Sequence, residues 1–239
     1  MTDSAPRIEV TVAAPVATVW HALRDKETIR HWHGWDYDGL DGEIDLIYFT
    51  EVDEDADART LSVQGGDLIR LEADGESTRV TRTRAPRGTN PDWDAYYAEI
   101  TEGWITFLHQ LRFAIERQPG VPRRTLFFGG GNPSGRSVAD ELGLPEGPTV
   151  ETSLLGEHVE GEVWFRSEHQ LGVTVDAWGD GLLVVVSAGP TEDNPADTAM
   201  AILSTYGLDD ARLAELRERW SPWWTERFPA DDQIPSEVE

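Results

Sequence analysis

The sequence predicts an α+β protein made of two consecutive units, each with a short antiparallel sheet and a long closing helix. Apolar residues recur at every second position in several short segments and at every third or fourth position in two long ones, which indicates strands followed by a helix in each half. A break containing proline and glycine at Gln118–Arg123 separates the halves. We therefore expect one domain over residues 1–118 and a second α+β domain over residues 124–239.

The first half is expected to open with a strand and two helices. Ile8, Val10 and Val12 alternate with polar residues, as in a half-buried strand. Pro15 suits the first turn of a helix, so a helix is predicted to follow directly. A short second helix is predicted over residues 26–32.

An antiparallel meander is predicted next, because four short segments are separated by acidic or glycine-containing turns. The charged segment 51–57 is predicted to be a loop. The strands are expected at residues 44–50, 59–63, 67–73 and 78–84.

A long amphipathic helix is predicted to close the first half and to end before Pro119 and Gly120. Its apolar residues recur at steps of three and four. They are Tyr97, Ile100, Trp104, Leu108, Leu111 and Ile115.

The second half loosely repeats this order. A strand at 125–128 and a glycine-rich turn are predicted first, and a final helix is expected to begin at Asp209, a suitable N-cap. Between them we predict a helix at 138–142 and strands at 162–167, 172–178 and 182–187. On the final helix Leu213, Leu216, Trp220 and Trp224 share one face, before an acidic tail from Asp231. The second unit is thus either a divergent copy of the first or an accessory domain.

Two stretches resemble the START-like (SRPBCC) superfamily, and within it the branch named after activators of the ninety-kilodalton heat-shock-protein ATPase. Residues 8–32 carry the Ala-Pro, Val-Trp-x-Ala-Leu and Trp pattern of that branch, and Gly103 with Trp104 resembles the start of its closing helix. The matching residues of the first stretch are Ala14, Pro15, Val19, Trp20, Ala22, Leu23 and Trp32. The resemblance covers residues 7–117, and it departs from the family where the arginine-rich segment 79–87 replaces a more apolar strand.

This resemblance implies a helix-grip fold, in which a curved antiparallel sheet surrounds the closing helix and a cavity lies between them. In many relatives this cavity binds a small apolar or aromatic molecule, and the resemblance implies no single reaction. Our first hypothesis is non-enzymatic binding of such a molecule, and we assign no catalytic residue, metal or cofactor. A chaperone-binding interaction module and a cavity enzyme of the cyclase or lyase type are the alternatives. The expected ligand-binding residues are Trp20, Trp32, Trp35, Tyr97, Trp104 and Leu108, for which ordinary core packing is the competing interpretation.

Composition excludes several other classes of function. The formal net charge is −25, so nucleic acid and anionic membranes would be repelled. The chain has no cysteine, which excludes disulfides and thiolate chemistry and favours a reducing, cytoplasmic setting. The longest apolar run, Leu182–Val186, is far too short to span a bilayer.

Four further clusters are weighed against simpler interpretations. Gly130–Ser137 has the glycine spacing of a phosphate-binding loop, but Arg136 stands where the lysine is needed. His31, His33 and Asp36 could supply metal ligands, although a helix end with both histidines facing water is favoured.

The arginine cluster forms the basic group of the first half: Arg79, Arg82, Arg84 and Arg87. Arginines of this kind recognise carboxylate or phosphate, but a solvated strand face balanced by carboxylates is favoured. Trp220, Trp223 and Trp224 mark either a partner surface or, more simply, a core. An enzyme would draw its acid or base from Tyr97, Glu102 or His109.

Overall fold

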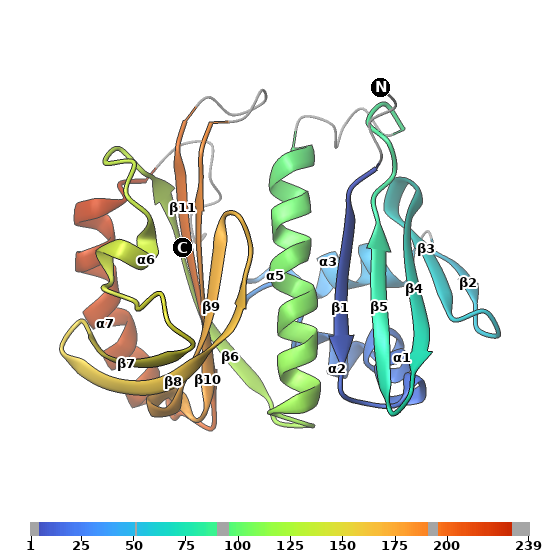
Figure 1. Cartoon of the computed structure of the whole chain (residues 1–239), viewed down its shortest axis with the longest axis horizontal. Coiled ribbons are helices and arrows are strands. Elements are labelled where there is room, and N and C mark those ends of the chain that lie inside the picture. The colour runs from blue at the N-terminus through green and yellow to red at the C-terminus, as the bar shows by residue number, and fades with distance from the viewer. Residues whose placement is uncertain (1–4, 51, 90–95, 191–195, 231–239) are drawn as a thin grey trace. The chain divides into compact units, whose positions relative to one another are not determined.

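The chain forms two compact units in the computed structural model, which describes residues 5–50, 52–89, 96–190 and 196–230 (Figure 1). The first unit comprises Met1–Gly34 and Gly39–Val121, and the second comprises Trp35–Asp38 and Pro122–Glu239. The predicted break at Gln118–Arg123 contains the junction between them. Residues 35–38 belong with the second unit although they lie within the first half of the chain.

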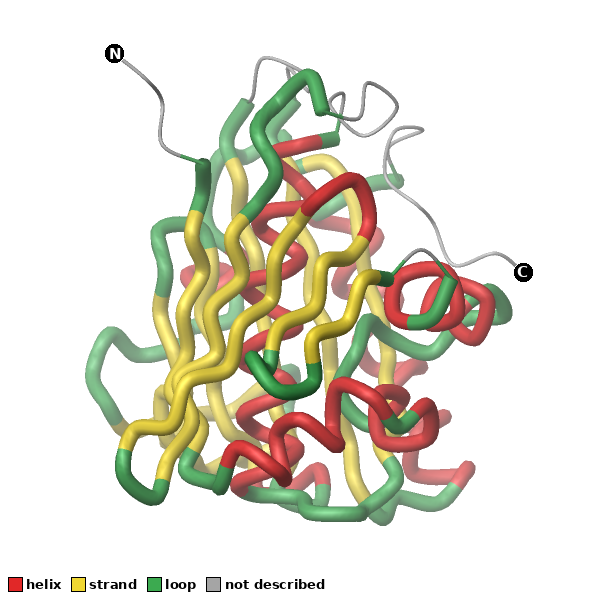
Figure 2. The backbone as a smooth tube through the Cα atoms, turned by 90° about the vertical axis from the view of Figure 1, so that its right-hand side faces the viewer, coloured by secondary structure: helices red, strands yellow, loops and turns green. Residues whose placement is uncertain are grey.

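An antiparallel sheet of five strands, in the order β1-β5-β4-β3-β2, forms the first unit. Its first strand pairs with its last, so that Val10 lies opposite Val80. Figure 2 turns this unit toward the viewer and shows the strands side by side with helices behind them. The strands are β1 (Arg7–Val12), β2 (Asp53–Asp55), β3 (Thr60–Val63), β4 (Asp67–Asp74) and β5 (Ser77–Thr83).

Four α-helices of the first unit are described: α1 (Val16–Arg24), α2 (Lys26–Arg30), α3 (Leu40–Tyr48) and α5 (Tyr97–Glu116), together with the short turn η1 (Gln64–Gly66). Apolar residues of β1, β4 and β5 pack with Trp104, Leu108 and Leu111 of α5 in a single core. The sheet therefore grips the long helix, which confirms the α+β helix-grip fold predicted for this half.

Two predictions for the first unit were wrong. Residues 44–50 were expected to form a strand, but most of them lie in α3, where Leu40, Ile44 and Ile47 are buried on one face at helical spacing. The segment 51–57 was expected to be a loop, yet Asp53–Asp55 pairs with β3 as a short, fully exposed strand. A run of apolar residues does not by itself separate a short helix from a strand, and the helical spacing is what decides it.

The second unit has a six-stranded antiparallel sheet in the order β6-β11-β10-β9-β8-β7. Its strands are β6 (Arg123–Gly131), β7 (Thr149–Leu154), β8 (Glu157–Arg166), β9 (Gln170–Val175), β10 (Gly181–Ala188) and β11 (Thr198–Tyr206). Its helices are α6 (Val138–Glu141) and α7 (Asp210–Arg227), with the short turn η2 (Asp176–Trp178).

The final helix begins where it was predicted, because the Asp209 side chain accepts a hydrogen bond from the Arg212 backbone N–H at 2.8 Å. Trp220 and Trp224 are buried in the core between α7 and the sheet, which confirms the core interpretation for these two rings. Trp223 is half-buried against the same core.

Two strands of the second unit were missed. β7 alternates Thr, Glu and Ser with only two buried apolar residues, Val150 and Leu154, and β11 contains several small residues. β8 also begins at Glu157, earlier than predicted, because its first half is largely polar. With these strands included, the last strand of the meander, β11, pairs with the first strand, β6, as β5 pairs with β1. The shared strand order favours the interpretation of the second unit as a divergent copy of the first.

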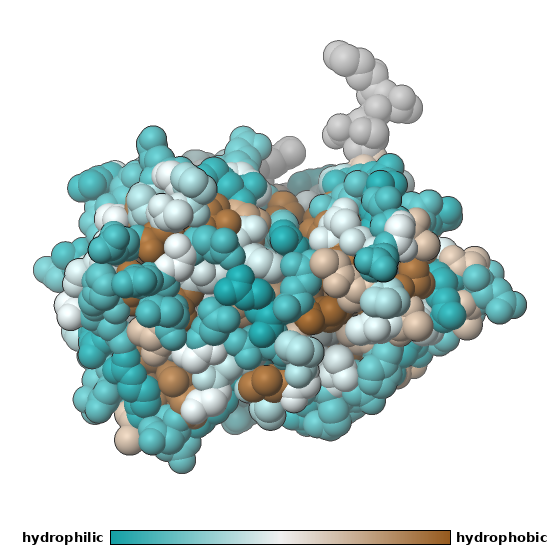
Figure 3. Space-filling model, turned by 60° about the horizontal axis from the view of Figure 1, so that its bottom comes forward, coloured by the Kyte–Doolittle hydropathy of each residue, from teal (hydrophilic) through white to brown (hydrophobic). Residues whose placement is uncertain are grey.

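Among the helices of the described ranges, none has the length and apolar character needed to cross a membrane. The face drawn in Figure 3 is mainly hydrophilic, with hydrophobic residues in small separate groups.

Candidate functional site

Aromatic rings from three parts of the chain cluster in the core between the sheet and α5 of the first unit. Trp32 and His33 follow α2, Tyr48 ends α3, and Trp104 and Phe107 lie on α5. Their rings meet mostly edge to face, with centroids 5.7 Å apart for Trp32 and Tyr48 and 4.7 Å apart for His33 and Phe107. Such pairs stabilise a core beyond simple burial and can also receive a flat apolar ligand.

His33 is fully buried within this cluster, so the prediction that both histidines face water was wrong. The chain leaves α2 with the His33 backbone N–H bonded to the Ile29 carbonyl, which starts the turn that carries the ring inward. Its Nε2 lies 3.2 Å from Glu43 Oε1, and its Nδ1 lies 3.1 Å from the Tyr48 hydroxyl. A hydrogen-bonded chain thus connects a half-buried carboxylate to a buried phenol.

The Tyr48 phenol is held in its neutral form. Burial raises the pKa of Tyr48 well above its usual value, and Glu43 raises it further while Arg82 opposes both. At neutral pH this hydroxyl is consequently a hydrogen-bond donor inside the unit.

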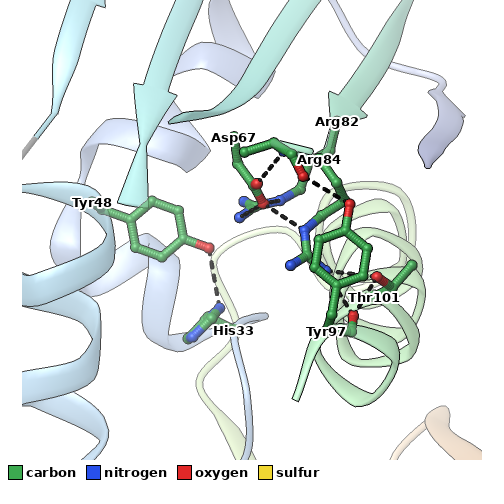
Figure 4. Close-up of polar contacts among 8 residues, drawn as sticks. His33, Tyr48, Asp67, Arg82, Arg84, Tyr97 and Thr101 are labelled. Carbon is green, nitrogen blue, oxygen red and sulfur yellow. Dashed lines mark hydrogen bonds and ion pairs between the residues drawn. The ribbon is translucent and has the colours of Figure 1, made fainter. Parts of the chain in front are cut away.

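A second polar group lies at the same end of the sheet, where Asp67 bonds two arginines (Figure 4). Arg82 donates to Asp67 Oδ2 from Nη2 at 2.7 Å and from Nε at 3.1 Å, and Arg84 Nε lies 2.9 Å from the same oxygen. Only 1% of the Arg82 side chain and 5% of the Arg84 side chain are exposed. The favoured prediction of a solvated arginine face was therefore wrong for these two residues.

The alternation of β5 explains which arginines are buried. Thr78, Val80 and Arg82 point inward because side chains of a strand alternate between its faces, whereas Arg79 points outward and pairs with Glu9 and Asp74. The outward arginine agrees with the solvated face that the sequence favoured.

Arg82 is unusual in its environment. Its Cζ lies 3.3 Å from the centroid of the Trp104 ring, in a cation–π contact. Burial lowers the pKa of Arg82 to about 10, with Asp67 acting in the opposite direction. The buried Nη1 atom of this guanidinium has no hydrogen-bond partner among the residues that the structure places.

Arg84 connects β5 to the start of α5. Its Nη1 donates to Thr101 Oγ1 at 2.6 Å and to the Tyr97 carbonyl at 3.2 Å, while the Tyr97 hydroxyl donates to the Ala85 carbonyl at 2.8 Å. The Tyr97 ring also faces the guanidinium of Arg84, 4.3 Å from its centroid. Tyr97 therefore fixes the entrance of the helix, and its hydroxyl is engaged by the backbone.

Three of the six predicted ligand-binding residues, Trp32, Trp104 and Leu108, lie in the core of the first unit, and Trp20 is half-buried against it. Trp35 does not join them, because it stacks on Phe127 of the second unit with centroids 4.1 Å apart. Sequence reasoning missed the polar members of the site: His33, Glu43, Tyr48, Asp67 and Arg82 act here as buried groups. For Arg82, its alternation with Val80 was the available signal.

The proposed metal ligands are not brought together. Asp36 belongs to the second unit, where its carboxylate accepts from the Thr125 backbone N–H and its own N–H donates to Thr125 Oγ1, both at 2.6 Å. Within the described ranges, no three His, Cys, Asp or Glu side chains are grouped so that they could hold a metal ion.

Only the first two residues of the glycine-rich segment Gly130–Ser137 lie in a strand, and the remaining residues connect that strand to α6. Gly129–Gly131 belong to β6, and a Cβ on Gly130 would lie 2.3 Å from the Phe228 carbonyl oxygen. The Trp224 indole donates to the Gly129 carbonyl at 3.2 Å, and the Gly131 N–H donates to the Pro229 carbonyl at 2.9 Å. These glycines allow the end of α7 to approach the backbone of β6.

An open pocket of about 510 Å³ lies in the second unit beside this contact. It contains none of the six predicted ligand-binding residues, but its lining includes part of the glycine-rich segment. Its lining is formed by Gly131, Asn132, Pro133, Ala196, Asp197, Pro229 and Ala230.

The fold defines a tandem helix-grip protein, a conclusion that rests on the strand orders and closing helices described above. No family model and no curated protein matches the chain. Solved structures similar to it include DynU16, a protein from the dynemicin biosynthetic locus, with 20% identity, 93% of this chain and 96% of that chain covered, and a TM-score of 0.35.

Two further similar structures are described as di-domain ARO/CYC proteins. StfQ, from the steffimycin biosynthetic pathway, has 10% identity and a TM-score of 0.34, with 92% of this chain and 94% of that chain covered. BexL, from the BE-7585A biosynthetic pathway, has 13% identity and a TM-score of 0.34, with 90% of this chain and 88% of that chain covered.

Proposed function

We propose that the first unit binds a small apolar or aromatic molecule between its sheet and α5, without changing it chemically. The observation that carries this proposal is the gathering of aromatic rings from α2, α3 and α5 on the concave side of the sheet. The proposed ligand-binding residues are Trp20, Trp32, Tyr97, Trp104 and Leu108. Trp35 is omitted because of its place in the second unit.

Ligand entry requires a side chain to move, since the rings of the cluster contact one another. Phe107 is the candidate for this movement, because it is only half-buried while Trp32, His33 and Tyr48 are fully buried. Its ring contacts both His33 and Trp104, so displacing it would open a path to the centre of the cluster.

Native mass spectrometry of freshly purified protein tests the proposal directly. A small molecule that is present in the native spectrum and lost on denaturation would support binding and would identify the chemical class. Equal native and denatured masses, together with no binding of an apolar probe, would count against it.

The location of binding can be tested with the neutral fluorescent probe N-phenylnaphthylamine. Phe107→Ala should shift its Kd by roughly threefold or more, whereas Trp223→Ala, which truncates a half-buried ring of the second unit, should leave it within about twofold. The opposite pattern would place the ligand in the second unit.

A cavity enzyme is the second candidate, and the chain Glu43–His33–Tyr48 favours it. The carboxylate, imidazole and phenol form a continuous hydrogen-bonded chain along which a proton can pass to or from a bound molecule. The same mass spectra separate the two candidates. If the molecule released on denaturation differs in mass from the molecule that was added, for example by loss of water, the protein has converted it. Release of the unchanged molecule would favour simple binding.

The third candidate is a chaperone-binding module, and it rests on the resemblance of residues 8–32 to the heat-shock ATPase activator branch. The exposed large apolar side chains in the described ranges are Tyr37, Leu46, Phe49 and Tyr96.

A cytoplasmic location likewise stays a prediction from the sequence.

A further inference from the structure

Among the described residues, two buried arginines bond to one buried carboxylate at one end of the first sheet. Arg82 and Arg84 both lie within 2.9 Å of Asp67 Oδ2, and all three side chains are at least nine-tenths buried. Glu43 lies against His33, and its side chain is partly exposed. A buried charge without a partner is costly, so an unmatched cation in a core calls for an anion.

We propose that the molecule bound by the first unit carries an anionic oxygen, as a small aromatic carboxylate or phenolate does, and that this oxygen binds Nη1 of Arg82. The inference rests on the binding function proposed above and adds the chemical class of the ligand. Three features of the site support it.

The guanidinium of Arg82 is oriented so that one donor remains available. Asp67 engages Nε and Nη2, while Nη1 has no hydrogen-bond partner in the described part of the chain. The Trp104 face attracts the cation but does not offer a hydrogen-bond acceptor in the plane of the guanidinium. An oxyanion beside Nη1 would satisfy the donor and balance the charge.

The surroundings of Arg82 suit an aromatic acid. The Trp104 ring offers a flat apolar surface directly against the guanidinium, and the Tyr48 ring lies beside Trp104 with centroids 6.3 Å apart. A ligand with an acidic group on an aromatic ring would place its charge at Arg82 and its ring among Trp104 and its neighbours.

A purely structural role makes a different prediction about the two kinds of ligand. Arg82→Met keeps the Arg84–Asp67 pair but removes two hydrogen bonds to Asp67, so a lower thermal midpoint is expected with either role. If Arg82 serves only the fold, the affinities for an anionic and a neutral ligand should fall together.

The experiment compares two fluorescent probes that differ only by an anionic group: neutral N-phenylnaphthylamine and anionic anilinonaphthalene sulfonate. We expect the wild-type protein to bind the anionic probe more tightly. Arg82→Met should raise the Kd of the anionic probe by roughly tenfold and change the Kd of the neutral probe by less than about twofold. Arg79→Gln removes an exposed arginine of the same strand and should change neither affinity.

The outcomes separate the two proposals. If neither probe binds, the binding function itself fails. If both bind and Arg82→Met lowers neither affinity, or lowers both together with the midpoint, the inference about an anion is wrong while binding stands. Should Arg82→Met not fold, Arg82→Gln removes the charge and keeps a polar side chain: loss of the preference for the anionic probe with the neutral probe still bound supports the inference, and a preserved preference overturns it.

Discussion

His109 on α5 is kept in its neutral form by its surroundings. Burial lowers the pKa of this imidazole from 6.5 to about 4, and the nearby Arg112 contributes in the same direction. The unfolded chain has no such environment, so its histidine takes up a proton at higher pH than the folded chain does. Between these two pKa values the unfolded state binds more protons, and stability is lost as the pH falls.

We therefore expect the free energy of unfolding to carry a penalty from His109 that grows as the pH decreases from 6.5 to 4, up to about 3 kcal/mol. His109→Gln should remove this part of the decline. Urea denaturation at several pH values measures it, and His158→Gln, which changes an exposed histidine, is the control. Parallel declines for His109→Gln and wild type would contradict the assignment.

Single residues also limit what the sequence could predict about the site. Trp32, Trp104 and Leu108 were named as cavity residues from the family resemblance, with core packing as the competing interpretation, and all three lie in the core of the first unit. Arg82 and His33 were assigned to solvent because such side chains are rarely buried, and their burial depends on partners distant in the chain. No pattern in the neighbouring sequence predicts that Arg82 pairs with Asp67 or that His33 pairs with Tyr48.

At the scale of elements, the contact between β6 and the end of α7 depends on the absence of a side chain at Gly130. The Phe228 carbonyl occupies the place of a Cβ there, so the helix end can approach only a glycine. The same approach allows the Trp224 indole to reach the Gly129 carbonyl.

Gly130→Ala should therefore destabilise the protein by roughly 1–3 kcal/mol, since the added methyl group overpacks a contact with backbone atoms that cannot turn aside. Gly147→Ala meets nothing within 4 Å and should be close to neutral. Chemical denaturation followed by tryptophan fluorescence compares the two. Equal stability of both variants would show that the end of α7 is not held against β6.

Elements also differ in how well their patterns predict them. The long helix α5 and the strands β4 and β5 have clear periodicity over many residues, and they were predicted close to their observed bounds. The helix α3 was mistaken for a strand, and β11 was missed, because a short apolar run or a run of small residues fits more than one structure. Tertiary packing decides such cases.

For the whole molecule, the sequence predicted two α+β units, with the helix-grip fold of the first implied by its family resemblance and the second left as a divergent copy or an accessory domain. The assignment of residues 35–38 to the second unit could not be foreseen. The chain leaves the first unit after Gly34 and returns to it at Gly39. Between these points, Trp35 stacks on Phe127 and Asp36 forms two hydrogen bonds with Thr125. These four residues lie within the first half of the sequence but belong to the second unit, and only the folded structure reveals this.

Trp35→Ala should consequently affect the second unit. Loss of the stacked ring is expected to weaken the Asp36–Thr125 hydrogen bonds, and hydrogen exchange of the Thr125 amide should become roughly tenfold faster while β1 to β5 stay protected. Leu46→Ala, at an exposed position of the first unit, should have little effect. Faster exchange in β1 to β5, with β6 unchanged, would refute this assignment.

The acidic strand β2 has a consequence for solubility. It lies at an open edge of the first sheet and consists of Asp53, Glu54 and Asp55, all exposed. An edge strand offers unpaired backbone groups on which another chain could add, and closely spaced negative charges repel such a chain. At 1 M salt the Debye length is only about 3 Å, so this repulsion is screened. Fibril-like self-association is then expected to begin at this edge.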